Sequence, residues 1–293
     1  MPSYKRYKDN MNSTIKTRNL YSKLHKLHDD SIAFDLSIPI NEVWNIEKSF
    51  FEDKIVLEAG CGGMGTQAIL IKQMHVKELM VIDLSIENIA MVKSNIEKKV
   101  ADLDNVDFFQ LDLSKDLLPA DKFDIIHCRG VFQHILDKEF ALKNFNRSLK
   151  VSGMLLVGVY NKGTLLSWFS TLLRYPFKLI SENTTMRILD LFIKSPDIVS
   201  GIVDHLYVPV QTRYSEKGLI RLFENYGFQL MKSVKPEFDI DSLNISFKHP
   251  FFKFWQKNIM FNSKNRIKWL SYILYGSGGH FMIFKKISHV VSN

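Results

Sequence analysis

Short apolar runs alternate with amphipathic stretches along the first half of the chain. Runs of this kind that end near glycine or aspartate are typical of buried parallel strands. Strands are expected at 54–60, 78–84, 106–112, 123–130 and 154–160. Apolar residues at helical spacing predict helices at 65–75, 85–100 and 137–150. The tripeptide "VSG" at 151–153 is expected to form the turn before the last of these strands.

The alternation of strands and helices ends near residue 160. Residues 161–206 contain helix-like apolar segments, and 214–228 predicts a helix that is capped by Ser215 and stopped by Gly227. The segments 228–237 and 280–288 are expected to form a closing pair of strands. The expected fold is therefore α/β: a doubly wound, Rossmann-like seven-stranded sheet with a closing antiparallel strand pair and two helical insertions.

This pattern divides the chain into a core that is interrupted twice. The core is expected at 51–160, continues at 207–237, and ends with the last core strand and a tail at 279–293. The other segments are an N-terminal basic helical cap at 1–50, a helical lid insertion at 161–206, and a basic, aromatic helical insertion at 238–278.

The stretch "LEAGCGGMG" at 57–65 follows the first strand and carries the first candidate chemistry. Its spacing, Gly60-x-Gly62-x-x-Gly65, matches the fingerprint of dinucleotide-binding loops, where glycines bring the backbone close to a pyrophosphate. Glu58 precedes these glycines, and its carboxylate would repel a phosphate and attract a cation. A purely structural strand-to-helix turn is the alternative for this loop.

Two aspartates end the second and third strands, at the sheet edge where ligands of such folds bind. A carboxylate at Asp83 can accept hydrogen bonds from both ribose hydroxyls of a nucleoside. Asp112 can accept a bond from the exocyclic amine of adenine, while the Leu113 amide can reach a ring nitrogen. A helix-capping role for Asp83 and a surface turn at Asp112 are the structural alternatives.

Together these motifs resemble the class I S-adenosylmethionine-dependent methyltransferases, in particular their small-molecule branch. "LEAGCGGMG" is similar to the opening motif of that family, "VIDLS" to its ribose motif and "QLDL" to its adenine motif. "CRGVFQHILD" at 128–137 opens a block that is similar to the family's fourth-to-fifth-strand segment. The turn "LKVSGM" departs from the usual Lys-Pro-Gly-Gly. The resemblance covers roughly 50–160 and 207–237 together with the final strand.

The resemblance implies the cofactor S-adenosyl-L-methionine, which leaves as S-adenosyl-L-homocysteine. This cofactor presents an α-ammonium where a dinucleotide presents a pyrophosphate, so Glu58 would attract it. No metal is implied. The cofactor-binding residues that it implies are Glu58, Gly60, Cys61, Gly62, Gly65, Asp83, Leu84, Asp112, Leu113 and Arg129.

His134 is the candidate catalytic residue, because it follows the fourth strand beside the expected position of the methyl group. It would act as a general base for a weakly acidic hydroxyl or amine. The alternative is a structural or substrate-shaping role. His205, Tyr207 and Tyr214 are expected to shape the acceptor site, and Cys61 is expected to be a small buried residue of the loop rather than a nucleophile.

The acceptor is less well specified than the cofactor. Both insertions are rich in Leu, Phe, Trp and Tyr, which favours a small hydrophobic or aromatic acceptor that is methylated on O, N or C. The fourth strand is followed by "CRGVFQ" and not by Asn/Asp-Pro-Pro-Tyr/Phe, which argues against methylation of base amines. A macromolecular acceptor, RNA or protein, and a non-catalytic cofactor-fold module are the alternatives.

Charge keeps phosphate-bearing partners open. The net charge of +8 is concentrated at the ends: residues 1–28 hold seven cations and one anion, and residues 242–293 hold eight cations and no anion. These ends could meet nucleic acid or lipid head groups, although no nucleic-acid motif accompanies them, so nucleic acid is the less favoured partner. Peripheral membrane contact through "SWFSTLLRYPFKLI" at 167–180 is a further hypothesis, and the sequence leaves the oligomeric state open.

Composition sets the remaining expectations. With 46% hydrophobic and 24% charged residues among 293, the chain is typical of globular proteins. We find neither a secretory signal nor an apolar run near the roughly 20 residues that span a bilayer. Only two cysteines occur, Cys61 and Cys128, so a disulfide framework is not indicated and a reducing cytoplasm is the expected location.

Overall fold

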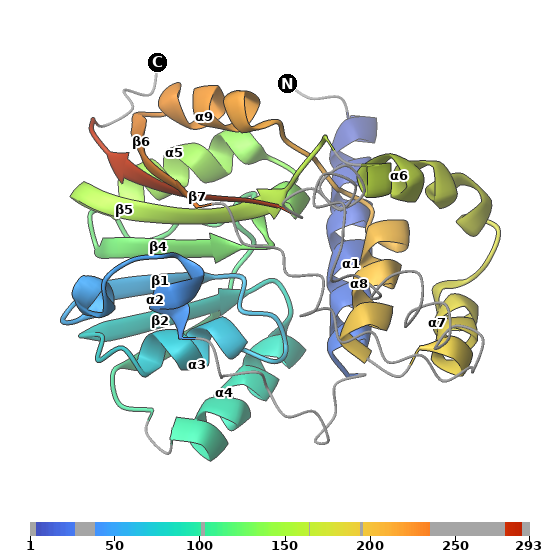
Figure 1. Cartoon of the computed structure of the whole chain (residues 1–293), viewed down its shortest axis with the longest axis horizontal. Helices are drawn as coiled ribbons and strands as arrows, with labels where there is room; N and C mark the ends of the chain where they lie inside the picture. The colour runs from blue at the N-terminus through green and yellow to red at the C-terminus, as the bar shows by residue number, and fades with distance from the viewer. Residues whose placement is uncertain are drawn as a thin grey trace, which may run out of the picture.

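A seven-stranded sheet with helices on both faces forms the centre of the molecule (Figure 1). The computed structural model describes residues 4–26, 39–100, 103–163, 165–193, 196–234 and 279–288. The strands are β1 (Ile55–Ala59), β2 (Glu78–Asp83), β3 (Val106–Gln110), β4 (Phe123–Arg129), β5 (Leu149–Tyr160), β6 (Phe228–Val234) and β7 (Gly279–Lys286). Their order in the sheet is β3-β2-β1-β4-β5-β7-β6.

Strand direction confirms the expected fold class. The strands β1 to β5 pair in parallel, and β7 runs antiparallel between β5 and β6. The strand order reverses between β1 and β4, and ligands of open parallel sheets bind in the crevice beyond the strand ends at such a point.

The helices begin where the sequence supplies caps. The Ser215 hydroxyl accepts the Gly218 amide at the start of α9, and the Asp137 carboxylate accepts the Phe140 amide at the start of α5. The longer helices are α1 (Tyr4–Lys26), α3 (Thr66–Lys72), α4 (Ile86–Val100), α5 (Lys138–Ser148), α6 (Leu165–Phe177), α7 (Glu182–Phe192), α8 (Pro196–Tyr207) and α9 (Glu216–Glu224). Short turns of helix form α2 (Ile40–Val43), η1 (Lys48–Phe51) and η2 (Phe132–His134).

Each face of the sheet is covered by its own hydrophobic layer. On one face, α2, α3 and α4 bury residues such as Trp44, Ile69 and Val92 against β1 and β2. On the other face, α5 and α9 pack against β4, β5 and β7, where Phe223 stacks on Phe284 with ring centroids 4.5 Å apart. Burial of apolar surface on both faces explains why the central strands read as nearly continuous hydrophobic runs.

A separate group of helices stands at the carboxyl-terminal edge of the parallel strands. Figure 1 places α1, α6, α7 and α8 together beyond the ends of β4 and β5. Leu20 and Leu24 of α1 are buried with Val199 and Val203 of α8 in a third hydrophobic cluster. Residues from the beginning of the chain and from the 161–206 segment therefore share one structure above the sheet.

One local expectation is wrong. The tripeptide at 151–153 does not form a turn before a strand; it lies inside β5, which begins at Leu149. Ser152 adopts a left-handed backbone conformation with φ 67°, and the pairing with β4 shifts register between Phe123 and Ile125. An irregularity of this kind absorbs the turn-forming residues without ending the strand.

The 238–278 insertion and its expected helix lie outside the described residues, so the division of the chain into core, cap and insertions stays a prediction. Within the described ranges, no helix combines the length and the apolar character needed to cross a membrane.

Candidate functional site

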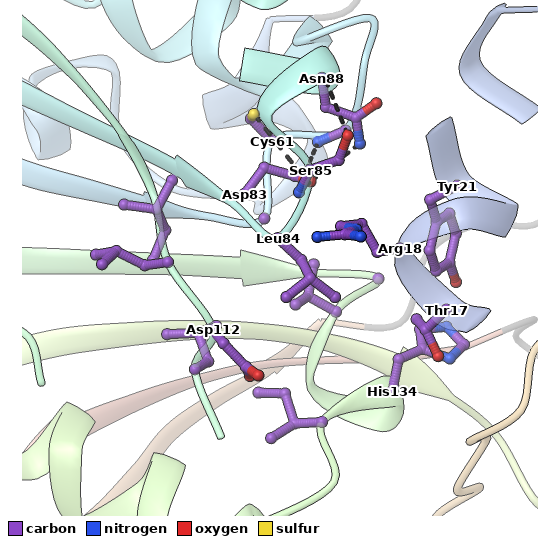
Figure 2. A pocket seen from close by; sticks show the side chains of 18 of the residues that line it. Thr17, Arg18, Tyr21, Cys61, Asp83, Leu84, Ser85, Asn88, Asp112 and His134 are labelled. Atoms are coloured by element: carbon purple, nitrogen blue, oxygen red, sulfur yellow. Dashed lines mark hydrogen bonds between the residues drawn. The ribbon is translucent and has the colours of Figure 1, made fainter. Parts of the chain in front are cut away.

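A cavity of about 280 Å³ lies at the carboxyl-terminal ends of β1, β2, β3 and β4, with α1 forming its opposite wall (Figure 2). The switch point of the sheet is therefore hollow, as expected for a ligand site. Of the residues predicted to bind the cofactor or the acceptor proton, these line the cavity: Glu58, Gly60, Cys61, Gly62, Asp83, Leu84, Asp112, Leu113, Arg129 and His134.

The glycine loop is shaped by close packing as well as by backbone conformation. Gly60 has φ +88°, and a Cβ atom there would lie 2.3 Å from a methyl carbon of Val131. Gly65 has φ +66°, and its Cβ would lie 2.7 Å from Val92. Only glycine fits both positions, so the loop can fold back until the Gly60 amide donates to the Ile82 carbonyl at 2.9 Å. Gly65 itself starts α3 and does not line this cavity.

Glu58 is a nearly fully buried carboxylate, with 1% of its surface exposed. Its Oε2 lies 2.6 Å from Nδ1 of His127, the residue directly beside it on β4. On the other side of the ring, the indole N–H of Trp44 donates to His127 Nε2 at 3.1 Å. A buried carboxylate is costly unless it has partners, and here a single imidazole links it to a tryptophan.

The carboxylate of Asp83 accepts hydrogen bonds from residues close to it. Its Oδ1 accepts the Ser85 amide at 2.9 Å and the Asn88 side-chain amide at 3.0 Å, and its Oδ2 accepts the Gly62 amide at 2.9 Å. Figure 2 shows Asp83, Ser85 and Asn88 gathered on one side of the cavity. The Cys61 thiol lies 4.0 Å from Oδ2 as a fourth, weak donor. A carboxylate offers about four acceptor sites, so a ligand hydroxyl would compete with this thiol rather than with a backbone amide.

Asp112 lies across the cavity from this cluster. The Ser114 amide donates to its Oδ1 at 2.9 Å, which is the turn geometry that the structural alternative predicted. Its backbone amide is bound by Asp116, and the neighbouring Leu113 is buried in the cavity wall. The carboxylate is thus held at the rim of the cavity by the loop that follows β3.

The wall opposite the strand ends comes from α1, which the sequence predicted only as part of a basic cap. Figure 2 shows Thr17, Arg18 and Tyr21 projecting from this helix beside the cavity. The helix is held there by Ser22, whose hydroxyl lies 2.7 Å from that of Ser85 at the start of α4. The helical spacing of Leu20, Tyr21 and Leu24 is the one signal that could have indicated a packed face on this helix.

One ring nitrogen of His134 is hydrogen-bonded, and the other has no hydrogen-bond partner among the described residues. Its Nδ1 lies 2.8 Å from the Val210 carbonyl, and because a carbonyl only accepts, Nδ1 must carry the proton. In the neutral ring Nε2 is then an unprotonated acceptor, and no hydrogen-bond partner for it is found among the described residues. Only 6% of the side chain is exposed. Burial lowers the pKa of His134 below its ordinary value, and the nearby Asp204 carboxylate offsets part of that shift.

Asp204 of α8 is the anion that faces this histidine. Its Oδ2 lies 4.0 Å from His134 Nε2, beyond a hydrogen bond but close enough for strong Coulomb attraction to an imidazolium. The hydroxyls of Tyr21 and Tyr160 donate to it at 2.7 and 2.8 Å. Burial, followed by the charge of Asp204, raises the pKa of both tyrosines, so they stay protonated donors.

A second cavity of about 300 Å³ adjoins the first between the glycine loop, α1 and α8. Both cavities share Tyr21, Cys61, Gly62, Gln67 and Gly130 as lining residues. The second cavity adds Leu24, Met64, Gly65, Thr66, Tyr160, Ser200, Gly201 and Asp204.

Three residues that were expected to shape the acceptor site do not line either cavity. His205 lies behind Tyr160, with ring centroids 4.6 Å apart. The Tyr207 hydroxyl is bound to Thr185 and to the Ile180 carbonyl, and Tyr214 packs against Phe132. Cys61 is buried, and burial raises the pKa of its thiol, which suits a small packing residue of the loop.

Comparison with known proteins places this site in a family. The model of a family described as "Methyltransferase domain" matches residues 39–233, more than half of the chain. The chain belongs to this methyltransferase family. The match includes the glycine loop, both aspartates and His134, and it begins after α1.

Relatives and solved structures agree with the assignment. A malonyl-[acyl-carrier protein] O-methyltransferase from Ilyobacter polytropus is 26% identical over 193 residues, which are 64% of this chain and 68% of that protein. A ubiquinone biosynthesis O-methyltransferase from Coxiella burnetii is 24% identical over 189 residues, 64% of this chain and 71% of that protein. The crystal structure of an S-adenosylmethionine-dependent methyltransferase from Mesorhizobium loti aligns with a TM-score of 0.51 at 11% identity, over 80% of this chain and 92% of that chain, and shows the shared fold.

The protein is thus an S-adenosylmethionine-dependent methyltransferase, and its cofactor is the one that the motifs implied rather than a dinucleotide. The cavity fits this cofactor on two observations. The backbone of Gly60, Cys61 and Gly62 lines the cavity, and the buried carboxylate of Glu58 lines the same space. A carboxylate there suits an ammonium and opposes a pyrophosphate.

Proposed function

We propose that this methyltransferase methylates a hydroxyl group of a small, largely apolar acceptor, with His134 as the general base. The observation that carries the proposal is the open Nε2 of His134, a buried acceptor nitrogen without a partner among the described residues, 4.0 Å from the Asp204 carboxylate. A base in this state is useful only to an acceptor that still carries a proton.

The cofactor-binding part of the proposal assigns each strand end to one part of the ligand. The carboxylate of Glu58 binds the α-ammonium, and the backbone of Gly60, Cys61, Gly62 and Arg129 surrounds the amino-acid end. Asp83 with Leu84 holds the ribose, and Asp112 with Leu113 holds the adenine. Gly65 contributes by letting α3 start close to the loop, since its Cβ would meet Val92.

When bound, S-adenosylmethionine supplies a methyl group activated by the positive charge on its sulfur. The protein's own residues then handle the proton and the solvent. His134 Nε2 accepts the proton of the acceptor hydroxyl, and its Nδ1–H stays bonded to Val210. The Asp204 carboxylate stabilises the resulting imidazolium, and Tyr21 and Tyr160 keep that carboxylate in place. Holding the reactants in line with water excluded supplies most of the remaining acceleration.

The second cavity supports an uncharged acceptor. Leu24, Met64 and Tyr160 line it together with the Asp204 anion. A carboxylate acceptor would be repelled by Asp204, and an ammonium would be held in its protonated, unreactive form. The two relatives named above are both O-methyltransferases by name, which agrees with transfer to oxygen.

The acceptor class can be tested with methyl-labelled cofactor. We expect label in a small, organic-soluble product when the protein is incubated with a panel of phenols, alcohols, carboxylic acids and amines, or with host extract. A methyl ester loses its label in mild alkali, whereas an ether and a methylated amine both keep it. Alkali-stable label in the product of a phenol or an alcohol that contains no amine therefore supports a hydroxyl acceptor. Alkali-labile label, or label recovered only in precipitated RNA or protein, would contradict the proposal.

The ribose assignment predicts a loss of affinity in Asp83→Asn. The substitution removes the charge and one acceptor oxygen, and hydrogen bonds to charged groups contribute about 1.5–3 kcal/mol. S-adenosylhomocysteine binding, measured by calorimetry, should weaken by that amount. Asp107→Asn, on an exposed position of β3, is the matched control and should bind normally. Unchanged affinity in Asp83→Asn would remove this residue from the ribose site.

A further inference from the structure

We propose that Trp44 and His127 are positioning residues that hold the Glu58 carboxylate and aim it at the cofactor's ammonium. The proposal rests on the cofactor-binding role assigned to Glu58 above. It adds two residues that do not line the cavity, on the opposite side of Glu58 from the ligand. Together we call Trp44, His127 and Glu58 the carboxylate relay.

The hydrogen atoms of the relay follow from the chemistry of its ends. The indole nitrogen of Trp44 can only donate, so His127 Nε2, 3.1 Å away, must be the acceptor and carries no proton. The single proton of the neutral ring is then on Nδ1, which donates to Glu58 Oε2 at 2.6 Å.

This arrangement decides which part of Glu58 faces the ligand. Trp44 holds the ring of His127 with its proton on Nδ1, because a proton on Nε2 would point at the indole N–H. The bond from His127 uses only one of the two carboxylate oxygens of Glu58. The other oxygen is left for the ligand.

Burial and backbone pairing make the relay rigid. Glu58 and His127 are paired residues of β1 and β4 in the centre of the sheet, and both are nearly inaccessible to solvent. Trp44 is fully buried just after α2, and its ring packs edge-on against His127 and Phe281, with centroids 5.4 Å away in each case. The segment before β1 thus acts on the cofactor site without touching it.

Other ionisable groups near the relay do not replace it. Arg129 lies on the adjacent part of β4 with its guanidinium over the Phe281 ring at 5.0 Å. Burial lowers the pKa of Arg129 and the charge of Glu58 raises it again, so the group stays a cation. The thiols of Cys61 and Cys128 are also within range of the charge of Glu58, and burial, followed by nearby carboxylates, raises the pKa of both, which keeps them neutral.

Two ligands separate the relay from general effects on the fold. S-adenosylhomocysteine carries the α-ammonium, whereas 5′-methylthioadenosine has the same nucleoside and thioether but lacks the amino-acid end. Calorimetric affinities for both should be measured on the full chain. We expect His127→Leu to weaken S-adenosylhomocysteine about 10- to 100-fold, the range for a lost hydrogen bond to a charged group, and 5′-methylthioadenosine by less than about 3-fold.

His127→Asn is the conservative variant, because the asparagine amide places an N–H donor near the position of Nδ1. It should restore most of the lost affinity for S-adenosylhomocysteine. Phe51→Leu, which alters the same hydrophobic cluster without touching the relay, should affect both ligands equally or not at all. Equal weakening of both ligands in His127→Leu would contradict the relay.

Trp44→Phe tests the other end of the relay and serves if His127→Leu does not fold. Without the indole donor, the ring nitrogen of His127 that carries the proton is no longer fixed, so the bond from Nδ1 to Glu58 is weakened. Affinity for S-adenosylhomocysteine should then fall about 10-fold at constant pH, the order expected for weakening one hydrogen bond to a charged group. Affinity for 5′-methylthioadenosine should stay nearly constant. Equal affinity of Trp44→Phe and the unaltered protein for S-adenosylhomocysteine would overturn the proposal.

Glu58→Gln distinguishes failure of the relay from failure of the proposed function. If Glu58→Gln selectively weakens S-adenosylhomocysteine while His127→Leu and Trp44→Phe do not, the relay is wrong and the binding role of Glu58 stands. If Glu58→Gln affects both ligands alike, Glu58 does not bind the ammonium, and both proposals about it fail together.

Discussion

Replacing His134 by glutamine should slow methyl transfer by about 10²- to 10⁴-fold, the usual contribution of a general base. Glutamine fills nearly the same space as histidine but offers no basic nitrogen. Affinity for S-adenosylhomocysteine should stay within about 2-fold, because a base for the acceptor adds little to cofactor binding. Single-turnover rates with a hydroxyl acceptor, together with calorimetry, measure the two effects. An undiminished rate would remove His134 as the base.

The pH profile gives this prediction a second readout. Burial lowers the pKa of His134 in spite of Asp204, so the neutral base persists below pH 6.5 and the acid limb of the rate profile should lie under that value. The limb should disappear in His134→Gln. Burial also lowers the pKa of His205, which lies behind Tyr160 outside the cavities, so His205→Gln is the matched control and should keep both rate and limb.

Much of the fold could be predicted because short, local stretches of the sequence determine where most strands and helices form. Buried runs such as 78–84 became β2 almost residue for residue, and Ser215 caps α9 as its position indicated. The turn predicted at 151–153 was wrong. Its residues favour a turn locally, but the pairing of Leu149 with Phe123 extends β5 across them. Tertiary pairing overrides such preferences routinely.

The site divides in the same way. Glu58, Asp83 and Asp112 follow strands, and the ends of parallel strands meet, so their convergence could be predicted from the sequence. The bond from Tyr21 to Asp204 joins residues 183 positions apart, and that between Trp44 and His127 joins residues 83 apart. The spacing of residues within helices and strands does not predict contacts between residues so far apart in the sequence. His127 also looked like an ordinary strand residue, because its partners come from β1 and from the segment before it.

The two walls of the site therefore differ in how they are built. The cofactor wall belongs to the sheet and to the segment that the family shares, from 39 to 233. The opposite wall combines α1, which precedes that segment, with α8. Tyr21 and Asp204 connect the two helices beside His134, so the proposed acceptor chemistry depends on a contact between distant parts of the chain.

Gly60→Ala should be the most damaging single-methyl change in the cofactor wall. A Cβ at this position would lie 2.3 Å from Val131, and φ is +88°. The left-handed conformation costs an alanine about 1–2 kcal/mol and overpacking adds about 1–3 kcal/mol, so the free energy of unfolding should fall by about 2–5 kcal/mol. Urea unfolding measures this loss, and affinity for S-adenosylhomocysteine should fall with it because the loop must move.

Gly130→Ala isolates the two causes. Gly130 has φ +75° but nothing within 4 Å of the added methyl, so it should lose only the conformational part, about 1–2 kcal/mol. Adding Val131→Ala to Gly60→Ala should recover part of the steric loss, since the closest contacts are the Val131 methyl carbons. Equal losses of unfolding free energy in Gly60→Ala and Gly130→Ala would contradict the steric part of this prediction. Backbone conformation alone, and not close packing against Val131, would then require glycine at position 60.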